Sequence, residues 1–147
     1  MMKKVLILNG PNLNLLGKRE PQHYGIMTLE EITKQLDELA CTFGIELRHF
    51  QSNHEGVLID QLQNAADWAE GVILNPGGYS HTSVALRDAV SALQIPVIEV
   101  HLSNIYNREQ FRQQSLIAPV CTGSIAGFGF RSYSAALYIL AGILNDK

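Results

Sequence analysis

Four short apolar runs, each ending in a cluster of polar side chains, constrain how this chain can fold. They cover residues 5–8, 45–50, 71–74 and 96–100, and the clusters that follow hold asparagine, serine, glutamine and histidine. Runs of this length bounded by turn residues are typical of strands. In an open parallel sheet the carboxyl ends of the strands share one edge, where such folds bind their ligands. Residues a hundred positions apart are therefore expected in one pocket.

Helical patterns alternate with these runs along the chain. Apolar spacing predicts helices that begin at Thr28, at Ser52, at Ser80 or Thr82, at about 107 and at Arg131 or Ser132. Thr28 with Glu31, and Ser52 with Glu55, fit a capping box. Strands are expected at 4–9, 45–51, 71–75, 96–100 and 118–122. This alternation favours one flavodoxin-like α/β domain over residues 1–147, a five-stranded parallel sheet of order 2-1-3-4-5 with helices on both faces.

The stretch from residue 10 to residue 27 has neither pattern. A loop of this length in a compact domain is usually a lid, a binding loop or a disordered segment. It carries Lys18, Arg19 and Tyr24 between glycines that can act as hinges, and its leucines at 13, 15 and 16 argue against disorder. We expect a lid over about residues 18–25 that closes on a ligand.

Composition limits the kinds of partner that the protein is expected to bind. The net charge is −3 and no basic stripe is present, which argues against nucleic acid and anionic membranes. No apolar stretch reaches membrane-spanning length, and the first residues are too short for a signal peptide, so a cytoplasmic protein is expected. Cys41 and Cys121 lack metal-ligand or redox spacing and are expected to be reduced, buried thiols. The charged fraction of 17% is low, a hint of subunit contacts.

Several chemistries lack their motif. The first strand is not followed by a dinucleotide or Walker loop, and no aspartate ends the first or third strand. The best candidate set of metal ligands is His81, Glu99 and His101. Glu99 and His101, however, are two residues apart on the same face of one strand, and no metal is expected. Lys18 is the only lysine placed to reach the pocket, which disfavours an imine mechanism. Acid–base chemistry without a cofactor remains.

Tyr24 is the candidate base. A phenol is a poor base at neutral pH unless a positive charge stabilises its anion, and Arg19 lies five residues upstream, with Arg108 from the predicted fourth helix as a helper. The alternative is an exposed tyrosine that covers apolar surface.

His101 is the candidate acid, because Glu99 on the same strand face would favour its charged form. The alternative is a satisfied core histidine. Asn12 and Asn75 can donate to a developing oxyanion. Arg112, one helical turn after Arg108, suits an anionic ligand, and the alternative there is a solvated surface.

These residues resemble type II 3-dehydroquinate dehydratase over essentially the whole chain. The resemblance is densest in three ordered motifs, NGPNLNLLGKREPQHYG at 9–25, NPGGYSHTSVALRDA at 75–89 and EVHLSN at 99–104. No functional position departs from the family pattern.

The resemblance implies an anti elimination of water from 3-dehydroquinate to 3-dehydroshikimate through an enolate, in the shikimate pathway of aromatic amino-acid biosynthesis. Tyr24 would take the proton at C2, with Arg19 stabilising its anion. Asn12 would stabilise the enolate oxygen through a water. His101, supported by Glu99, would protonate the departing hydroxyl. No cofactor or metal is implied.

The resemblance also implies how the substrate is held. Leu102 and Ser103 would offer backbone amides to its carboxylate at the start of the predicted fourth helix. The ring hydroxyls and the carboxylate would further be bound by Asn75, His81 and Arg112. Asp88 would reach the site of a neighbouring subunit in a homododecamer built of trimers.

Three other readings stay open on the residues alone. The chain could be a module that binds a small polyol acid, a structural scaffold, or an enzyme of the same reaction that uses an imine on Lys18. The sequence also leaves open whether the enzyme serves aromatic biosynthesis or quinate breakdown.

Overall fold

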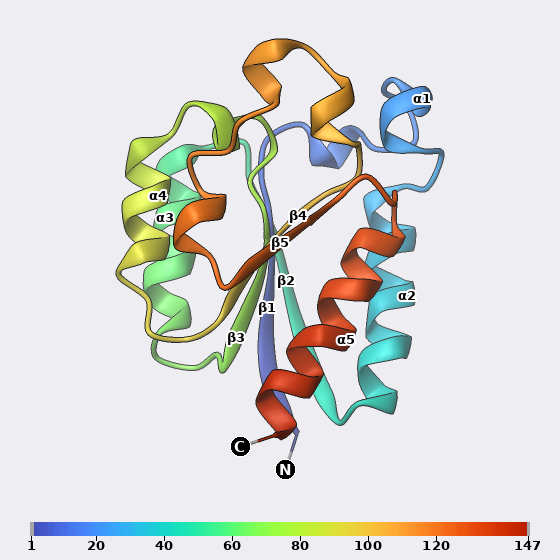
Figure 1. The fold of residues 1–147 in the computed structure, drawn as a ribbon. Helices are drawn as coiled ribbons and strands as arrows, with labels where there is room; N and C mark the ends of the chain where they lie inside the picture. Colours follow the sequence, from blue (N-terminus) through green and yellow to red (C-terminus); the bar gives the residue numbers. More distant parts are fainter. Residues whose placement is uncertain (1, 147) are drawn as a thin grey trace.

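The computed structural model describes residues 2–146, and its centre is one parallel sheet of five strands in the order β2-β1-β3-β4-β5 (Figure 1). The strands are β1 (Lys3–Asn9), β2 (Ile45–Gln51), β3 (Gly71–Asn75), β4 (Val97–His101) and β5 (Gly123–Ala126). The strand order and parallel pairing confirm the predicted fold class.

Helices cover both faces of the sheet. In Figure 1, α2 (Leu29–Thr42) and α5 (Arg131–Asn145) lie on one side, and α3 (Glu55–Ala65) and α4 (Val84–Ser91) lie on the other. Two apolar clusters fill the layers between the sheet and these helix pairs. All five residues of β3 and all five of β4 are buried, as expected for central strands of a parallel sheet. Among residues 2–146, no helix combines the length and apolar character that crossing a membrane requires.

Helix starts agree with the sequence only in part. The capping box of α2 is confirmed, since the Thr28 hydroxyl accepts from the Glu31 N–H at 3.1 Å and Glu31 accepts from the Thr28 N–H at 3.2 Å. The box predicted for Ser52 and Glu55 is wrong, because Glu55 instead accepts a hydrogen bond from Ser83, the N-cap of α4. With Ser83 as its N-cap, α4 begins at Val84, two residues after the later of the two predicted starts, Ser80 and Thr82.

The fifth strand was predicted five residues too early. Residues Ala118–Val120 form a 3-10 turn, η5, and β5 begins at Gly123, which pairs with Ile98. Pro119 explains the error, since its ring nitrogen has no N–H for a sheet ladder and suits the first turn of a helix.

The predicted fourth helix is also wrong. The segment forms two 3-10 turns, η3 (Ile105–Asn107) and η4 (Gln110–Arg112), because Arg108 and Glu109 between them have extended backbone. Arg108 and Arg112 therefore do not share a helical face. The segment arches over the carboxyl edge of the sheet (Figure 1).

The loops that follow β1 and β3 touch. A Cβ atom at Gly10 would lie 2.5 Å from the carbonyl oxygen of Pro76, so only glycine fits there. Gly77 has a positive φ of 61° and packs against Pro11. This close approach brings Asn12 and Asn75 to the same pocket. The first loop, for which the sequence predicted neither helix nor strand, holds η1 (Leu13–Leu15) and a short helix α1 (Pro21–Tyr24).

The two cysteines differ from expectation. Cys41 is exposed on α2, so its predicted burial is wrong. Cys121 is partly buried, and desolvation together with the nearby Glu99 charge raises the pKa of its thiol to about 12. It is therefore a neutral thiol at physiological pH.

Candidate active site

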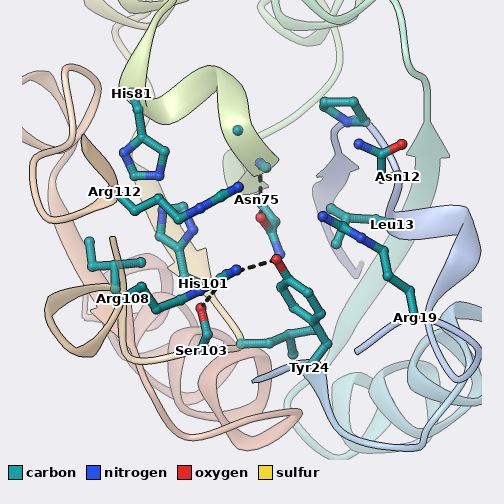
Figure 2. Close-up of a pocket in the computed structure, with 15 residues that line it drawn as sticks. Asn12, Leu13, Arg19, Tyr24, Asn75, His81, His101, Ser103, Arg108 and Arg112 are labelled. Atoms are coloured by element: carbon teal, nitrogen blue, oxygen red, sulfur yellow. Dashed lines mark hydrogen bonds between the residues drawn. The ribbon is translucent and has the colours of Figure 1, made fainter. Parts of the chain in front are cut away.

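A polar pocket lies at the carboxyl edge of the sheet (Figure 2). Its walls come from the loop after β1, α1, the end of β3, η2 (Gly77–His81), the end of β4 and the segment of η3 and η4. Ten of the predicted site residues line it: Asn12, Arg19, Tyr24, Asn75, His81, His101, Leu102, Ser103, Arg108 and Arg112. The ends of β1, β3 and β4 and the first loop therefore converge as predicted, whereas the polar cluster that follows β2 does not line the pocket.

Two predicted residues do not line the pocket. Glu99 is fully buried behind His101. Asp88 is exposed on α4 and does not belong to the pocket of its own chain. The pocket also includes five residues with no predicted role, namely Pro11, Leu13, Gly77, Gly78 and Ile105.

Tyr24 lies among arginines. Arg108 Nη1 donates a hydrogen bond to the Tyr24 hydroxyl at 2.7 Å (Figure 2). The Arg19 guanidinium lies over the ring of the same tyrosine, 4.7 Å from its centroid. Arg108 therefore contacts the phenolic oxygen directly, whereas Arg19 acts on the ring face. Both guanidinium groups thus place positive charge beside the side chain that is the candidate base.

His101 has a buried carboxylate behind it. Its Nε2 lies 2.6 Å from Oε2 of Glu99. Ser80 Oγ donates to the same oxygen at 2.6 Å, and Ser115 Oγ contacts both carboxylate oxygens at 2.9 and 3.0 Å. With Nε2 directed at Glu99, Nδ1 is the ring nitrogen that can face a ligand.

Glu99 stays ionised although it is buried. Burial by itself would raise the pKa of this carboxyl, but the hydrogen bond and charge of His101 and the hydroxyls of Ser80 and Ser115 outweigh it and hold the pKa below its ordinary value. The two serines were not predicted, because neither is close to Glu99 in sequence.

His81 and Arg112 form the pocket wall that faces Asn12 and Arg19 (Figure 2). His81 Nδ1 lies 2.8 Å from the carbonyl oxygen of Gln114, and the His81 ring stacks on that of His101 at 6.2 Å. Desolvation lowers the pKa of His81, and the charges of His101 and Arg112 act in the same direction against the bond to Gln114. His81 is therefore suited to a neutral role in hydrogen bonding.

A buried network orients Asn75. Its Oδ1 accepts from the Gly77 N–H at 3.1 Å and its Nδ2 donates to the Tyr133 hydroxyl at 2.9 Å. The single proton of Tyr133 is given to Asn9 Oδ1. Burial raises the pKa of Tyr133, so this donor stays neutral. No motif in the sequence pointed to Tyr133 as part of the site.

Asn12 is held in an uncommon conformation. Its φ is 69°, in the left-handed region that asparagine tolerates better than most residues. Its backbone N–H donates to Asn53 Oδ1 at 3.0 Å. Asn53 also accepts from Gln51, and its carbonyl oxygen accepts from the Tyr79 hydroxyl at 2.9 Å. The polar cluster after the second strand thus supports the site from behind, a role the sequence did not assign.

The fold and the pocket together define a flavodoxin-like α/β protein whose pocket gathers one tyrosine, two histidines and three arginines at the carboxyl edge of its sheet. The chain belongs to the family described as dehydroquinase class II, whose sequence model matches residues 3–141.

Similar proteins and solved structures agree with this family assignment. The chain is 57% identical to a 3-dehydroquinate dehydratase of Pelotomaculum thermopropionicum, over 95% of this chain and 97% of that protein. It is 55% identical to one of Bacillus cereus, over 99% of each. The crystal structure of type II dehydroquinase from Butyrivibrio crossotus superposes with a TM-score of 0.93 at 43% identity, over 95% of this chain and 97% of that one. The family predicted from the three motifs is confirmed.

Proposed function

We propose that this protein removes water from 3-dehydroquinate to give 3-dehydroshikimate, by an anti elimination through an enolate, within the shikimate pathway. The observation that carries the proposal is the pairing of Tyr24 with Arg108 and of His101 with Glu99 in one pocket. A base held by a cation and an acid held by an anion are the two groups that such an elimination needs. The family and its named relatives supply the substrate.

Each residue takes one step of the reaction. Tyr24, as phenolate, takes a proton from C2, and Arg108 and Arg19 stabilise its charge before transfer. Negative charge then develops on the enolate oxygen, which Asn12 stabilises through a water. His101 gives its proton to the hydroxyl that leaves from C1, and the Glu99 carboxylate, 2.6 Å from its Nε2, holds the ring in place. The enolate then re-forms the ketone as the C1–O bond breaks, a C1=C2 double bond forms and the protonated hydroxyl leaves as water. No oxidation or reduction occurs, so the route calls for no redox cofactor.

Binding of the substrate falls to the rest of the pocket. Arg112 and the backbone amides of Leu102 and Ser103 hold the carboxylate, and Asn75 and His81 hold ring hydroxyls. All five line the cavity. The amides precede a 3-10 turn rather than the α-helix expected there, so they bind as individual donors.

A direct assay tests the proposal. Purified protein given 3-dehydroquinate should produce the enone absorbance of the product. A binding module would bind the acid without turnover, and a scaffold would show neither turnover nor a thermal shift with pathway acids. An imine route would leave a borohydride-stable adduct on Lys18, and we expect no gain in mass. Wild-type protein that binds the substrate and never produces the enone would overturn the proposal.

We also propose that the protein is a cytoplasmic homododecamer of trimers in which Asp88 completes the site of a neighbour. The exposed position of Asp88 on α4 supports a role between subunits. Native mass spectrometry tests the assembly. Co-expression of Tyr24→Phe and Asp88→Asn subunits should restore part of the activity, because some sites then have both residues. The control is co-expression of Tyr24→Phe and His101→Ala subunits, which should restore no activity. Both residues line the pocket of the same chain, so every site in such a mixture lacks one of them.

A further inference from the structure

Three consecutive residues behind the pocket each hold a polar group of the site. We call residues 114–116 the strap. The carbonyl oxygen of Gln114 contacts His81 Nδ1 at 2.8 Å. The Ser115 hydroxyl contacts the Glu99 carboxylate, and the Leu116 N–H donates to the Ser80 carbonyl oxygen at 2.7 Å. The strap is itself tied to α4, because Arg87 Nη1 donates to the Leu116 carbonyl oxygen at 2.7 Å.

The hydrogen bonds of Ser115 leave its hydroxyl proton only one acceptor, the Glu99 carboxylate. A serine oxygen has two lone pairs and one proton. The lone pairs accept from the N–H groups of Ile117 at 3.1 Å and Ala118 at 3.0 Å. The proton must therefore point to the Glu99 carboxylate, 2.9 and 3.0 Å away. The backbone turn that follows the strap thus fixes this hydroxyl as a donor to a buried anion.

We infer that Ser115 is a positioning residue, which keeps Glu99 ionised and aimed at His101. Ser115 does not line the pocket, and it acts on the reaction only through that carboxylate. The inference rests on the proposed function insofar as His101 is the acid of the reaction. It adds a group from outside the three family motifs to the proton-donating side of the site.

Other titratable groups lie near Glu99 and must be considered when the effect of Ser115 on its charge is measured. His101 on the same strand faces it directly, His81 on η2 senses its charge, and Cys121 lies beside it before β5. Arg112 acts on His81 from the pocket wall. Cys121 is neutral at physiological pH and His81 is biased toward its neutral form. The Glu99 carboxylate is therefore the charge whose loss on the acid side the experiment follows, through its contact with His101.

The experiment is the titration of the His101 ring by NMR in ligand-free protein, for wild type and Ser115→Ala. Loss of a donor destabilises the carboxylate, so Glu99 takes a proton at higher pH. We expect the acid-side transition of the pair to move up by about one pH unit. The acid limb of kcat should move with it. Ser115→Thr, which keeps the hydroxyl, should restore the wild-type titration.

Matched controls separate positioning from general damage. Ser124→Ala removes an exposed serine on β5 beside Glu99, and its titration should equal that of wild type. If Ser115→Ala does not fold, Ser115→Cys takes its place, because a thiol of similar size is a weaker donor. An acid-side transition that stays at the wild-type pH in a folded variant overturns the inference. The NMR readout needs no turnover, so failure of the proposed reaction would be recognised separately.

Discussion

Arg108 Nη1 donates to the Tyr24 hydroxyl at 2.7 Å, although 84 residues separate the two in sequence. Arg19, only five residues from Tyr24, lies over its ring and forms an ion pair with Glu20 at 3.6 Å. The guanidinium that touches the phenolic oxygen thus comes from the segment after β4 and not from the loop of the tyrosine. The two arginines are therefore expected to contribute unequally.

Arg108→Ala should reduce kcat/KM more than Arg19→Ala. Loss of a hydrogen bond from a charged donor costs about 1.5–3 kcal/mol, which corresponds to roughly ten- to hundredfold in rate. Steady-state kinetics of both variants tests this, with Arg48→Ala as the control, because Arg48 stacks on Trp68 away from the pocket. An equal loss in the two variants would contradict the assignment of Arg108.

Tyr24→Phe should abolish turnover and leave the affinity for the product within about tenfold, because the phenolic oxygen takes the proton but the ring still fills its place. Calorimetry with 3-dehydroshikimate measures the affinity, and the enone assay measures the rate. A phenylalanine variant that retains substantial kcat would show that another group is the base.

Asn53→Ala should lower kcat by about fivefold, since one hydrogen bond of roughly 1 kcal/mol holds the Asn12 backbone in its left-handed conformation. Asn53→Asp keeps the acceptor oxygen and should recover most of the loss. In a double-mutant cycle, Asn53→Ala should add little to Asn12→Ala. Fully additive effects would mean that Asn53 acts on something other than Asn12.

Tyr133→Phe should lower the free energy of unfolding by about 1–3 kcal/mol, because Asn9 and Asn75 each lose a partner inside the protein. Urea unfolding measures the change. Tyr138→Phe on the same helix is the matched control, since that side chain is exposed, and its stability should equal that of wild type. KM should also rise for Tyr133→Phe as Asn75 loses its orientation.

Glu99→Gln should change how stability depends on pH. The pKa of Glu99 is lowered in the folded protein, so its contribution is fully present above its ordinary value of 4.5 and is lost as pH falls through the folded pKa. The variant should therefore be less stable than wild type at pH 7, and this deficit should shrink below about pH 4.5. Denaturant unfolding from pH 3 to pH 7 tests this, with the exposed Glu46→Gln as control. A deficit that stays constant over that range would contradict an ionised Glu99.

The sequence by itself determined the order of the sheet, the family and most of the pocket wall. Apolar runs specify the central strands. Asn75 and His101 end β3 and β4, and Asn12 lies three residues past the end of β1, so their convergence follows from the shared carboxyl edge of a parallel sheet. Pro119 contradicted the fifth strand, but the apolar pattern around it concealed the signal. The prediction of a fourth helix was wrong because helix propensity alone does not show where extended backbone interrupts a short segment.

Only the tertiary structure decided which side chains touch. Arg108 on Tyr24, Ser115 on Glu99 and Tyr133 on Asn75 are contacts between elements 16 to 84 residues apart. Periodicity reports the face on which a side chain lies, but the meeting of two atoms depends on how loops of defined length pack over the sheet edge. A hydrogen bond requires its atoms to be placed within a few tenths of an ångström. The folded chain supplies that placement, and a one-dimensional pattern does not contain it.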